Sequence, residues 1–218
     1  MKRIDMSAIL SLCVLMIFIV AGCAEVQKPS LDAEAHNNQG VTHGKKGLFD
    51  KAIYEFNKAI EINPRHAKAY YNRGLAHHNK GQYDRAISDY TKAIELNPKY
   101  AMAYKNRGYA YSNKGQYEEA ISDYTKAIEI KPRHANAYND RGFIYYIKGQ
   151  HDQAISDFTK AIEINPRHAL AYDNRIVAYI EKKEYEKAWD DVNKAQDLGL
   201  QMHPEILKAL REASGRER

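Results

Sequence analysis

The chain has 218 residues, 28% of them charged, and a formal net charge of +5 at pH 7. Acidic and basic residues alternate along most of the sequence, so the small positive excess is spread out rather than gathered into a patch. This pattern is typical of a solvated helical surface and argues against a nucleic-acid-binding footprint, so no nucleic acid is expected as a partner.

The amino terminus combines two basic residues with an apolar segment. Lys2 and Arg3 are followed by an apolar run over residues 9–20, and the sequence Val-Ala-Gly-Cys then ends at Cys23. A short apolar run that ends at small residues is typical of a secretory signal peptide. With its cysteine, this segment resembles the signal peptide and lipobox of a bacterial lipoprotein.

The resemblance implies that residues 1–22 are removed and that Cys23 becomes a lipidated amino terminus. In that family the cysteine sulfur carries a diacylglyceryl group, and the amino group usually carries a further acyl chain such as palmitate. Two or more chains hold a protein stably on a bilayer. The alternative is an uncleaved transmembrane helix, because a span needs about 20 residues and no charge interrupts residues 6–24. The short run and its small-residue end favour the lipoprotein.

The expected mature chain starts with a short polar tether over residues 23–32, which contains Pro29. Ala24 follows the cysteine, where the sorting rules of many Gram-negative lipoproteins place aspartate in proteins that stay in the inner membrane. The resemblance therefore implies the outer membrane of the bacterial envelope, with the chain facing the periplasm. Because Cys13 leaves with the signal peptide and Cys23 is lipidated, no disulfide is expected.

A repeat of 34 residues occupies residues 33–202. The interval is kept by two series of alanines, by the glycines Gly40, Gly74, Gly108 and Gly142, and by the prolines Pro64, Pro98, Pro132 and Pro166. Such a register predicts stacked helical hairpins, each of which exposes an apolar face until the next hairpin buries it.

The unit from Ala101 to His134 reads AMAYKNRGYAYSNKGQYEEAISDYTKAIEIKPRH, which resembles the tetratricopeptide repeat. The resemblance implies an all-α fold, a right-handed solenoid of helical hairpins closed by a capping helix. Its five units are expected over residues 33–66, 67–100, 101–134, 135–168 and 169–202.

Small residues are expected to set the spacing of the helices. Gly108 and Ala120 would let the two helices of one hairpin approach closely, and Ala127 would receive the next hairpin. Gly115 would make the turn between the two helices. The space between them would be filled by Tyr104, Tyr111, Tyr117 and Tyr124.

Both ends of the array depart from the repeat. The fifth unit has Ile176 in place of the packing glycine and Lys183 in place of the turn glycine. Pro204 then starts an amphipathic segment, so we expect the capping helix over residues 203–213 and a tail over 214–218. The first unit is irregular at His36, Gln39 and His43.

In tetratricopeptide proteins the first helix of each hairpin lines a concave groove. The ninth position of that helix gives an apolar stripe of Val41, Leu75, Tyr109, Phe143 and Val177, and the sixth gives a polar ladder of Asn38, Asn72, Asn106, Asp140 and Asn174. Such a surface suits an extended peptide or a partner helix. The candidate groove residues are Tyr71, Asn72, Leu75, Lys105, Asn106, Tyr109, Asn139, Phe143, Tyr146, Asn174 and Val177, with Ile147 beside them. The alternative is that these residues pack against a neighbouring helix or the inner face of the superhelix.

Some tetratricopeptide domains hold a peptide carboxyl terminus with a clamp of two lysines, two asparagines and an arginine. Lys105 matches one clamp lysine, but Tyr109 replaces an asparagine, and Asp140 and Asn174 stand where the arginine would be needed. A peptide carboxylate is therefore not the expected ligand. Structural hydrogen bonds or ion pairs between hairpins are expected instead for Arg73, Arg107, Arg141 and Arg175.

The chain has nine histidines, but no two of them are four residues apart, the spacing of a helical metal site. The sequence has no nucleophile elbow and no phosphate-binding loop, and the mature chain would have no free cysteine. We therefore expect no metal, no cofactor and no enzymatic activity.

The expected function is that of a scaffold or adaptor that recruits a protein partner of the envelope to the membrane, where the anchor raises its effective concentration. The alternative is an assembly factor for an outer-membrane complex, similar to the tetratricopeptide lipoproteins that serve pilus secretins or barrel insertion. Self-association through the first or last hairpin is a third hypothesis.

Overall fold

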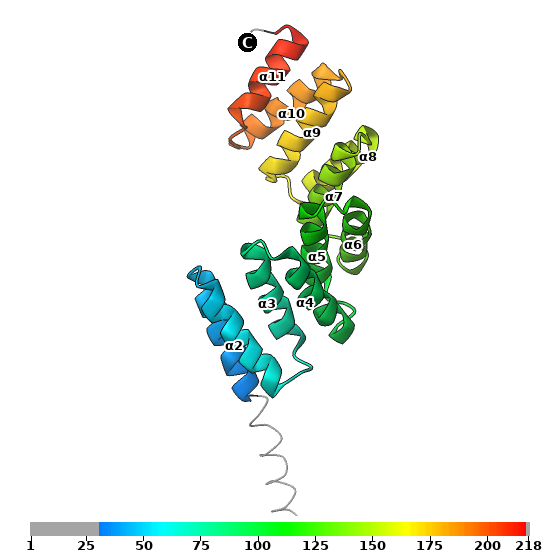
Figure 1. Ribbon diagram of the computed structural model, residues 1–218. Coiled ribbons are helices and arrows are strands. Elements are labelled where there is room, and N and C mark those ends of the chain that lie inside the picture. The colour runs from blue at the N-terminus through cyan, green and yellow to red at the C-terminus, as the bar shows by residue number, and fades with distance from the viewer. Residues whose placement is uncertain (1–30, 217–218) are drawn as a thin grey trace, which may run out of the picture. The chain divides into compact units, whose positions relative to one another are not determined.

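The computed structural model describes residues 31–216. The predicted signal peptide, Cys23 and most of the predicted tether lie outside these residues, as do residues 217–218. The described part of the chain contains eleven helices and no strand, which confirms the predicted all-α fold (Figure 1). None of these helices has the length and apolar character needed to cross a membrane. The chain forms two compact bodies, an N-terminal body that ends at Leu96 and a C-terminal body that begins at Asn97.

The N-terminal body contains two helical hairpins. A helix over residues 31–45 is followed by α2 (Phe49–Ile62), and α3 (Ala67–Asn79) is followed by α4 (Tyr83–Leu96). The helix over 31–45 includes Leu31 and Asp32, which the sequence analysis placed in the tether. Figure 1 shows α3 and α4 side by side, and α2 also packs against α3.

The C-terminal body contains three hairpins and one further helix. The hairpins are α5 (Ala101–Asn113) with α6 (Tyr117–Ile130), α7 (Ala135–Ile147) with α8 (His151–Ile164), and α9 (Ala169–Glu181) with α10 (Tyr185–Asp197). The last helix, α11 (Pro204–Ser214), packs on α9 and α10. This arrangement confirms the predicted capping helix.

Glycine lets an aromatic ring lie directly against the first helix of each hairpin except the last. A Cβ atom added to Gly74 would lie 2.7 Å from the ring of Tyr90, and one added to Gly142 would lie 2.8 Å from the ring of Phe158. Real Cβ atoms do not approach other atoms so closely, so these positions require glycine. Equivalent contacts pair Gly40 with Phe56 and Gly108 with Tyr124. The predicted packing role of Gly108 is therefore confirmed.

The last hairpin exchanges both members of this pair. Ile176 replaces the glycine, and Val192 replaces the aromatic residue at the facing position of the second helix. Both side chains are buried in one cluster with Leu210 of α11. A larger residue on α9 and a smaller one on α10 thus fill the same space between the helices, and α11 covers it.

The turns inside the hairpins use the left-handed backbone region. Gly115 has a φ of +74° and Gly149 a φ of +72°, and no atom lies near the place of a missing Cβ at either position. Lys183, at the equivalent place in the last hairpin, has a φ of +59°. An L-residue with a side chain is strained in this region, so the last turn keeps the geometry at an energetic cost.

Candidate functional site

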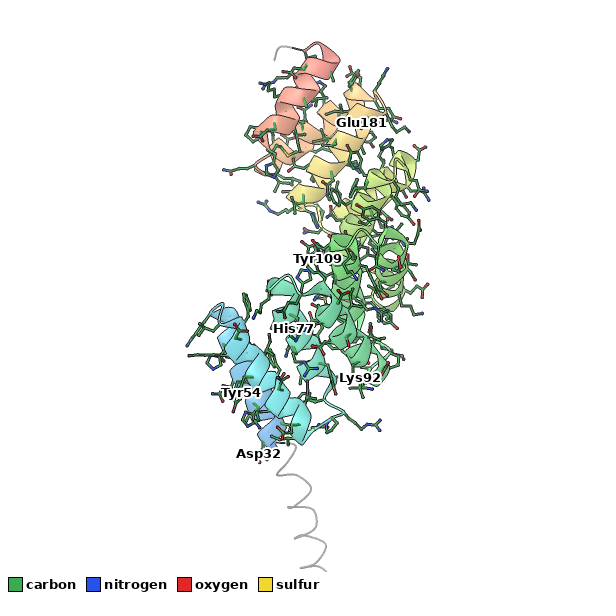
Figure 2. The ribbon with its side chains drawn as sticks, viewed as in Figure 1. Asp32, Tyr54, His77, Lys92, Tyr109 and Glu181 are labelled. Atoms are coloured by element: carbon green, nitrogen blue, oxygen red, sulfur yellow. The ribbon has the colours of Figure 1, made fainter. Side chains whose placement is uncertain are left out.

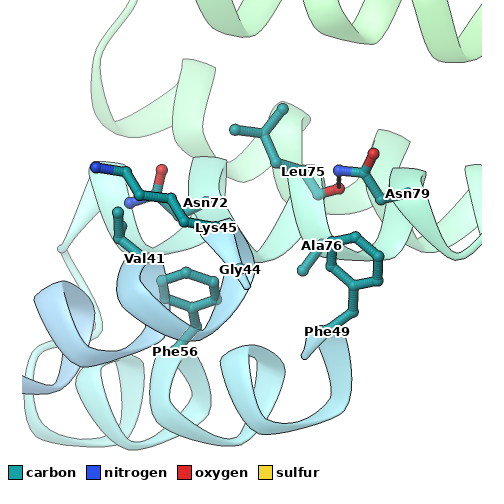
Figure 3. A pocket seen from close by; sticks show the side chains of 9 residues that line it. All are labelled: Val41, Gly44, Lys45, Phe49, Phe56, Asn72, Leu75, Ala76 and Asn79. Atoms are coloured by element: carbon teal, nitrogen blue, oxygen red, sulfur yellow. Dashed lines mark hydrogen bonds between the residues drawn. The ribbon is translucent and has the colours of Figure 1, made fainter. Parts of the chain in front are cut away.

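Each body contains one pocket beside the ninth-position residues predicted to form the apolar stripe. The N-terminal pocket (Figure 3) has a volume of about 240 Å³ and is lined by Val41, Gly44, Lys45, Phe49, Phe56, Asn72, Leu75, Ala76 and Asn79. The C-terminal pocket has a volume of about 340 Å³ and is lined by Tyr109, Ser112, Asn113, Tyr117, Tyr124, Asn139, Asp140, Phe143, Ile144 and Ile147. The structure thus brings Val41 together with Leu75, and Tyr109 together with Phe143.

The two pockets occupy equivalent positions, two repeats apart in the sequence. Their floors match: Phe49 and Phe56 in the first correspond to Tyr117 and Tyr124 in the second. The other seven equivalent lining positions differ: Val41, Gly44, Lys45, Asn72, Leu75, Ala76 and Asn79 correspond to Tyr109, Ser112, Asn113, Asp140, Phe143, Ile144 and Ile147. The C-terminal pocket therefore has the larger apolar side chains and a carboxylate, whereas the N-terminal pocket has a lysine; each pocket is lined by two asparagines.

Large apolar side chains remain accessible around the C-terminal pocket. Tyr109 on α5, labelled in Figure 2, is 48% exposed, and Phe143 and Ile147 on α7 are 44% and 43% exposed. The deeper wall is made by Tyr124 and Ile144, which are almost fully buried. Exposed aromatic and aliphatic side chains around a hollow are typical of a site where an apolar group of a partner binds.

Asp140 places a carboxylate in this apolar setting. The side chain is half-buried, and burial raises the pKa of its carboxyl group. Lys105, the Asn139 amide and His168 each oppose this rise in pKa. Asp140 adds to the rise that burial causes in the pKa of Tyr124, and both residues line this pocket. Asp140 is therefore a partly desolvated acid beside exposed aromatic rings.

Both amide side chains of the N-terminal pocket form hydrogen bonds within the protein. The Asn79 amide donates a hydrogen bond of 2.8 Å to the Leu75 carbonyl, drawn as a dashed line in Figure 3. The Asn72 amide donates one of 2.9 Å to the Asn37 side chain. Lys45 also lines this pocket (Figure 3). The amide of the C-terminal pocket that lies one repeat after Asn79 is bonded in the same way, since Asn113 donates a hydrogen bond of 2.9 Å to the Tyr109 carbonyl.

Part of the predicted polar ladder connects neighbouring hairpins. The Asn174 amide donates a hydrogen bond of 3.0 Å to Asn139, just as Asn72 donates to Asn37. Asn106 and Asn139 are both 7% exposed. Asn106 and Asn139 therefore offer a partner little accessible surface, which agrees with the alternative that such residues pack between helices, whereas Asn72 and Asn174 are half-buried.

The remaining candidate groove residues lie outside the exposed rim. Tyr71 contacts the ring of Tyr90 at a centroid distance of 5.9 Å, and Tyr146 lies 5.5 Å from the His151 ring. Val177 is half-buried on α9 and lines neither pocket. Sequence reasoning missed Ser112 and Asn113 as lining residues, although they occupy the twelfth and thirteenth positions that face the groove in tetratricopeptide proteins.

The arginines have the predicted structural role, with one correction. Arg175 on α9 donates hydrogen bonds of 2.7 and 2.6 Å to the carboxylate of Asp191 on α10, and one of 2.7 Å to Thr159 on α8. Each ion pair therefore joins the two helices of a single hairpin, and the additional bond reaches the preceding hairpin. Arg73 makes the same contacts with Asp89 and Asn57. In the first hairpin, His36 and Glu55 form a pair at 2.7 Å instead.

Histidines at the repeat boundaries also serve packing. His134 lies 3.3 Å from the Met102 sulfur, and His168 lies 3.1 Å from the Asn136 side chain. Burial lowers the pKa of both rings, which favours their neutral form. Among residues 31–216, no three potential metal ligands lie together.

Comparison with known proteins relates this architecture to a family. Residues 67–100, 101–134 and 135–168 each match the family described as "Tetratricopeptide repeat", and residues 45–81 match one described as "TPR repeat". The chain belongs to the tetratricopeptide repeat family. No curated protein matches it.

Solved tetratricopeptide structures share the fold. PilF of Pseudomonas aeruginosa is 19% identical, with a TM-score of 0.77 and coverage of 86% of both chains, which shows a likeness of fold alone. YrrB, described as "a TPR protein with an unusual peptide-binding site", is 25% identical, with a TM-score of 0.67 and coverage of 89% of this chain and 97% of its own.

A peptide complex is also similar to part of the chain. The first tetratricopeptide domain of Spaghetti (RPAP3), bound to the HSP90 peptide SRMEEVD, is 29% identical, with a TM-score of 0.54. The match covers 55% of this chain and 95% of that domain. Tetratricopeptide proteins are generally non-enzymatic scaffolds, and the chain is a protein-interaction scaffold of this type.

Proposed function

We propose that this tetratricopeptide protein is a lipid-anchored adaptor of the bacterial envelope, which binds a segment of another protein in the C-terminal pocket. The observation that supports the pocket is the joint exposure of Tyr109, Phe143 and Ile147 on two neighbouring helices. An extended peptide or a helix of the partner would bury these side chains and gain roughly 25 cal/mol for each Å² of apolar surface removed from water.

The anchor would act by concentration. Acyl chains on Cys23 would hold the protein at the outer membrane, and the tether would keep the first hairpin near the lipid surface. A captured envelope protein would then encounter membrane-bound targets at a higher effective concentration, with no chemical step in the adaptor. The support for this part is the resemblance of residues 1–23 to a lipoprotein signal.

Photocrosslinking in intact cells tests the pocket. A photoreactive residue is placed at Tyr109, and a matched control is placed at Glu119, an exposed position on α6. We expect one envelope protein to be trapped from position 109 and not from position 119. Equal capture from both positions, or none, would argue against the pocket as the working surface. Capture of a secretin or a barrel-assembly component would favour the alternative of an assembly factor.

A separate experiment tests the anchor. Cells that express the wild-type chain or the Cys23→Ser variant are labelled with a palmitate analogue and then fractionated. We expect the wild type to carry the label in the outer-membrane fraction and the variant to lose the label. Retention of the label by the variant would contradict lipidation at Cys23 without affecting the proposal for the pocket.

A further inference from the structure

Both pockets have two aromatic residues at equivalent positions, but the charge at the rim is opposite. Asp140 is the single charged residue among those that line the C-terminal pocket, and Lys45 is the single charged residue among those that line the N-terminal pocket. Asp140 corresponds to Asn72, and asparagine also stands at the equivalent places 106 and 174. The fold therefore accepts an amide here, and the carboxylate distinguishes this one pocket.

Asp140 also differs from the four aspartates that pair with an arginine of the same hairpin, and Asp173, which is 3% exposed, likewise has no arginine partner in the described part of the chain. Asp89, Asp123, Asp157 and Asp191 each receive two hydrogen bonds from an arginine. Asp140 receives one long hydrogen bond of 3.4 Å from Asn139. Lys105 and His168 act on it electrostatically, but within residues 31–216 no basic side chain forms an ion pair with it. A half-buried carboxylate with so few partners can gain much from a cation brought by another molecule.

We infer that the C-terminal pocket binds a protein segment that presents an arginine or lysine between apolar residues, with its cation paired to Asp140. The alkyl part of that side chain, or the plane of a guanidinium, would lie against the rings of Tyr109 and Phe143. Ile147 would contact a flanking apolar residue. The inference rests on the proposed function, because it states which partner chemistry the proposed pocket selects.

Charge complementarity separates this partner from other peptide classes. An acidic segment, such as the SRMEEVD peptide in the RPAP3 complex, would bring further carboxylates towards Asp140 and be repelled. Lys105 on α5 is a nearby positive charge that stabilises the ionised carboxylate of Asp140. The same charge would repel the cation of a basic partner and weaken its binding. Its removal should therefore strengthen the binding of a basic segment, and removal of Asp140 should weaken it.

Peptide selection tests the inference directly. The full chain, purified in detergent and immobilised, is used to select from a random twelve-residue phage library, in parallel with Asp140→Asn and with Glu119→Gln. The last variant removes one acidic charge from the exposed face of α6 and serves as a control. We expect the wild type and Glu119→Gln to enrich sequences with one lysine or arginine flanked by apolar residues, and Asp140→Asn to lose that basic residue. Circular dichroism confirms that the variants remain folded.

Affinity measurements then isolate the ion pair. Fluorescence anisotropy compares the most enriched peptide with an analogue that has norleucine in place of its basic residue. We expect Asp140→Asn to bind the basic peptide about tenfold more weakly and the norleucine peptide equally well, and Lys105→Gln to bind the basic peptide several-fold more tightly.

Several outcomes would overturn the inference. These are enrichment of the same basic motif by Asp140→Asn, enriched sequences without a basic residue, no enrichment from any chain, or a motif that matches this chain's own sequence. The last result would identify a second copy as the occupant. A Tyr109→Ser variant is included in the same selection: if the wild type enriches purely apolar sequences and this variant does not, the proposed function stands and the charge requirement alone is removed. Failure of the proposed function would instead appear in the photocrosslinking experiment, where the photoreactive residue at position 109 would trap no envelope protein in cells.

Discussion

The hairpins α7–α8 and α9–α10 of the C-terminal body have the same arrangement of helices but different residues where the helices meet. The first uses Gly142 against Phe158, and the second uses Ile176 against Val192. The turn residue changes as well, from Gly149 to Lys183, with little change in φ. The difference teaches that the helix spacing depends on the combined volume of the facing pair, so one member can grow if the other shrinks.

The two hairpins are also covered by different neighbours, because α9 packs on the inner hairpin and α11 on the last one. Its second face is covered by α11, whose Leu210 is fully buried against Ile176 and Val192. Trp189, the single tryptophan of the chain, packs at the edge of this cluster and donates a hydrogen bond of 3.2 Å to Ser214. Its fluorescence therefore reports on the last hairpin, whereas circular dichroism reports on all helices.

Truncation of Leu210 should have the largest effect. Leu210→Ala is expected to lower the free energy of unfolding of the last hairpin by about 3 kcal/mol, because it opens a cavity against two buried side chains. Urea titration followed by Trp189 fluorescence checks this, and the loss should be smaller in circular dichroism if the inner hairpins unfold separately. The matched control is Lys208→Ala, at an exposed position of α11. Equal midpoints for the wild type and Leu210→Ala would mean that α11 does not cap the array.

An exchange of the facing pair tests the volume argument. Gly142→Ile should lower the free energy of unfolding by roughly 2 to 3 kcal/mol, because its Cβ would meet the Phe158 ring at 2.8 Å. Phe158→Val alone should also destabilise, since it leaves a cavity. The double variant copies the last hairpin and should recover at least half of the summed loss in a double-mutant cycle. Strictly additive losses would contradict the idea that volume alone sets the spacing.

The sequence is sufficient to predict most of the fold because the repeat constrains it many times. α3, α5, α7 and α9 begin at Ala67, Ala101, Ala135 and Ala169, the first residues of the predicted units. Only one of the two substitutions at the last hairpin was identified from the sequence. Ile176 was recognised as a replacement for the packing glycine, but Val192, one repeat after Phe158, was not recognised as a replacement for the facing aromatic residue. That compensation depends on a contact between helices, which a list of departures from a consensus does not contain.

The candidate site was less predictable, for a physical reason. Position numbers within a helix place Tyr109 and Phe143, which both line the C-terminal pocket, on one surface, since backbone geometry fixes that face. They did not predict that Asn72 and Asn174 bond to the preceding hairpin, because a side-chain rotamer depends on packing with a helix distant in sequence. Asp140 was grouped with the amides, although its carboxylate is what sets this pocket apart.

The turn residue offers a smaller test of the same comparison. Lys183→Gly should raise the free energy of unfolding by about 1 kcal/mol, because glycine adopts a φ of +59° without the strain that an L-residue carries. The reciprocal Gly149→Lys should lose a similar amount. Thermal unfolding followed by circular dichroism and Trp189 fluorescence measures both. A loss on Lys183→Gly would show that the lysine side chain, not the backbone, determines the stability of this turn.

The smallest effect is expected from the sixth position, where α7 has Asp140 and α9 has Asn174. Burial raises the pKa of Asp140 above its usual value near 3.8, so the folded chain holds this proton more tightly than the unfolded chain. The protonated Asp140 therefore stabilises the fold relative to the ionised one. This stabilisation is lost as the pH rises from below 3.8 through the raised pKa. Asp140→Asn removes this loss and should be more stable by about 0.5 kcal/mol at pH 7, with the difference vanishing near pH 3.

Urea titrations of the wild type and Asp140→Asn at pH 7 and pH 3 measure this difference, and Asn174→Asp should show the opposite change. An Asp140→Asn variant that is less stable at pH 7 would mean that Lys105 and His168 already compensate the carboxylate in the free protein. A gain in stability together with a loss of basic-peptide binding would instead show that Asp140 opposes folding and serves recognition, a combination expected of a binding residue and not of a structural one.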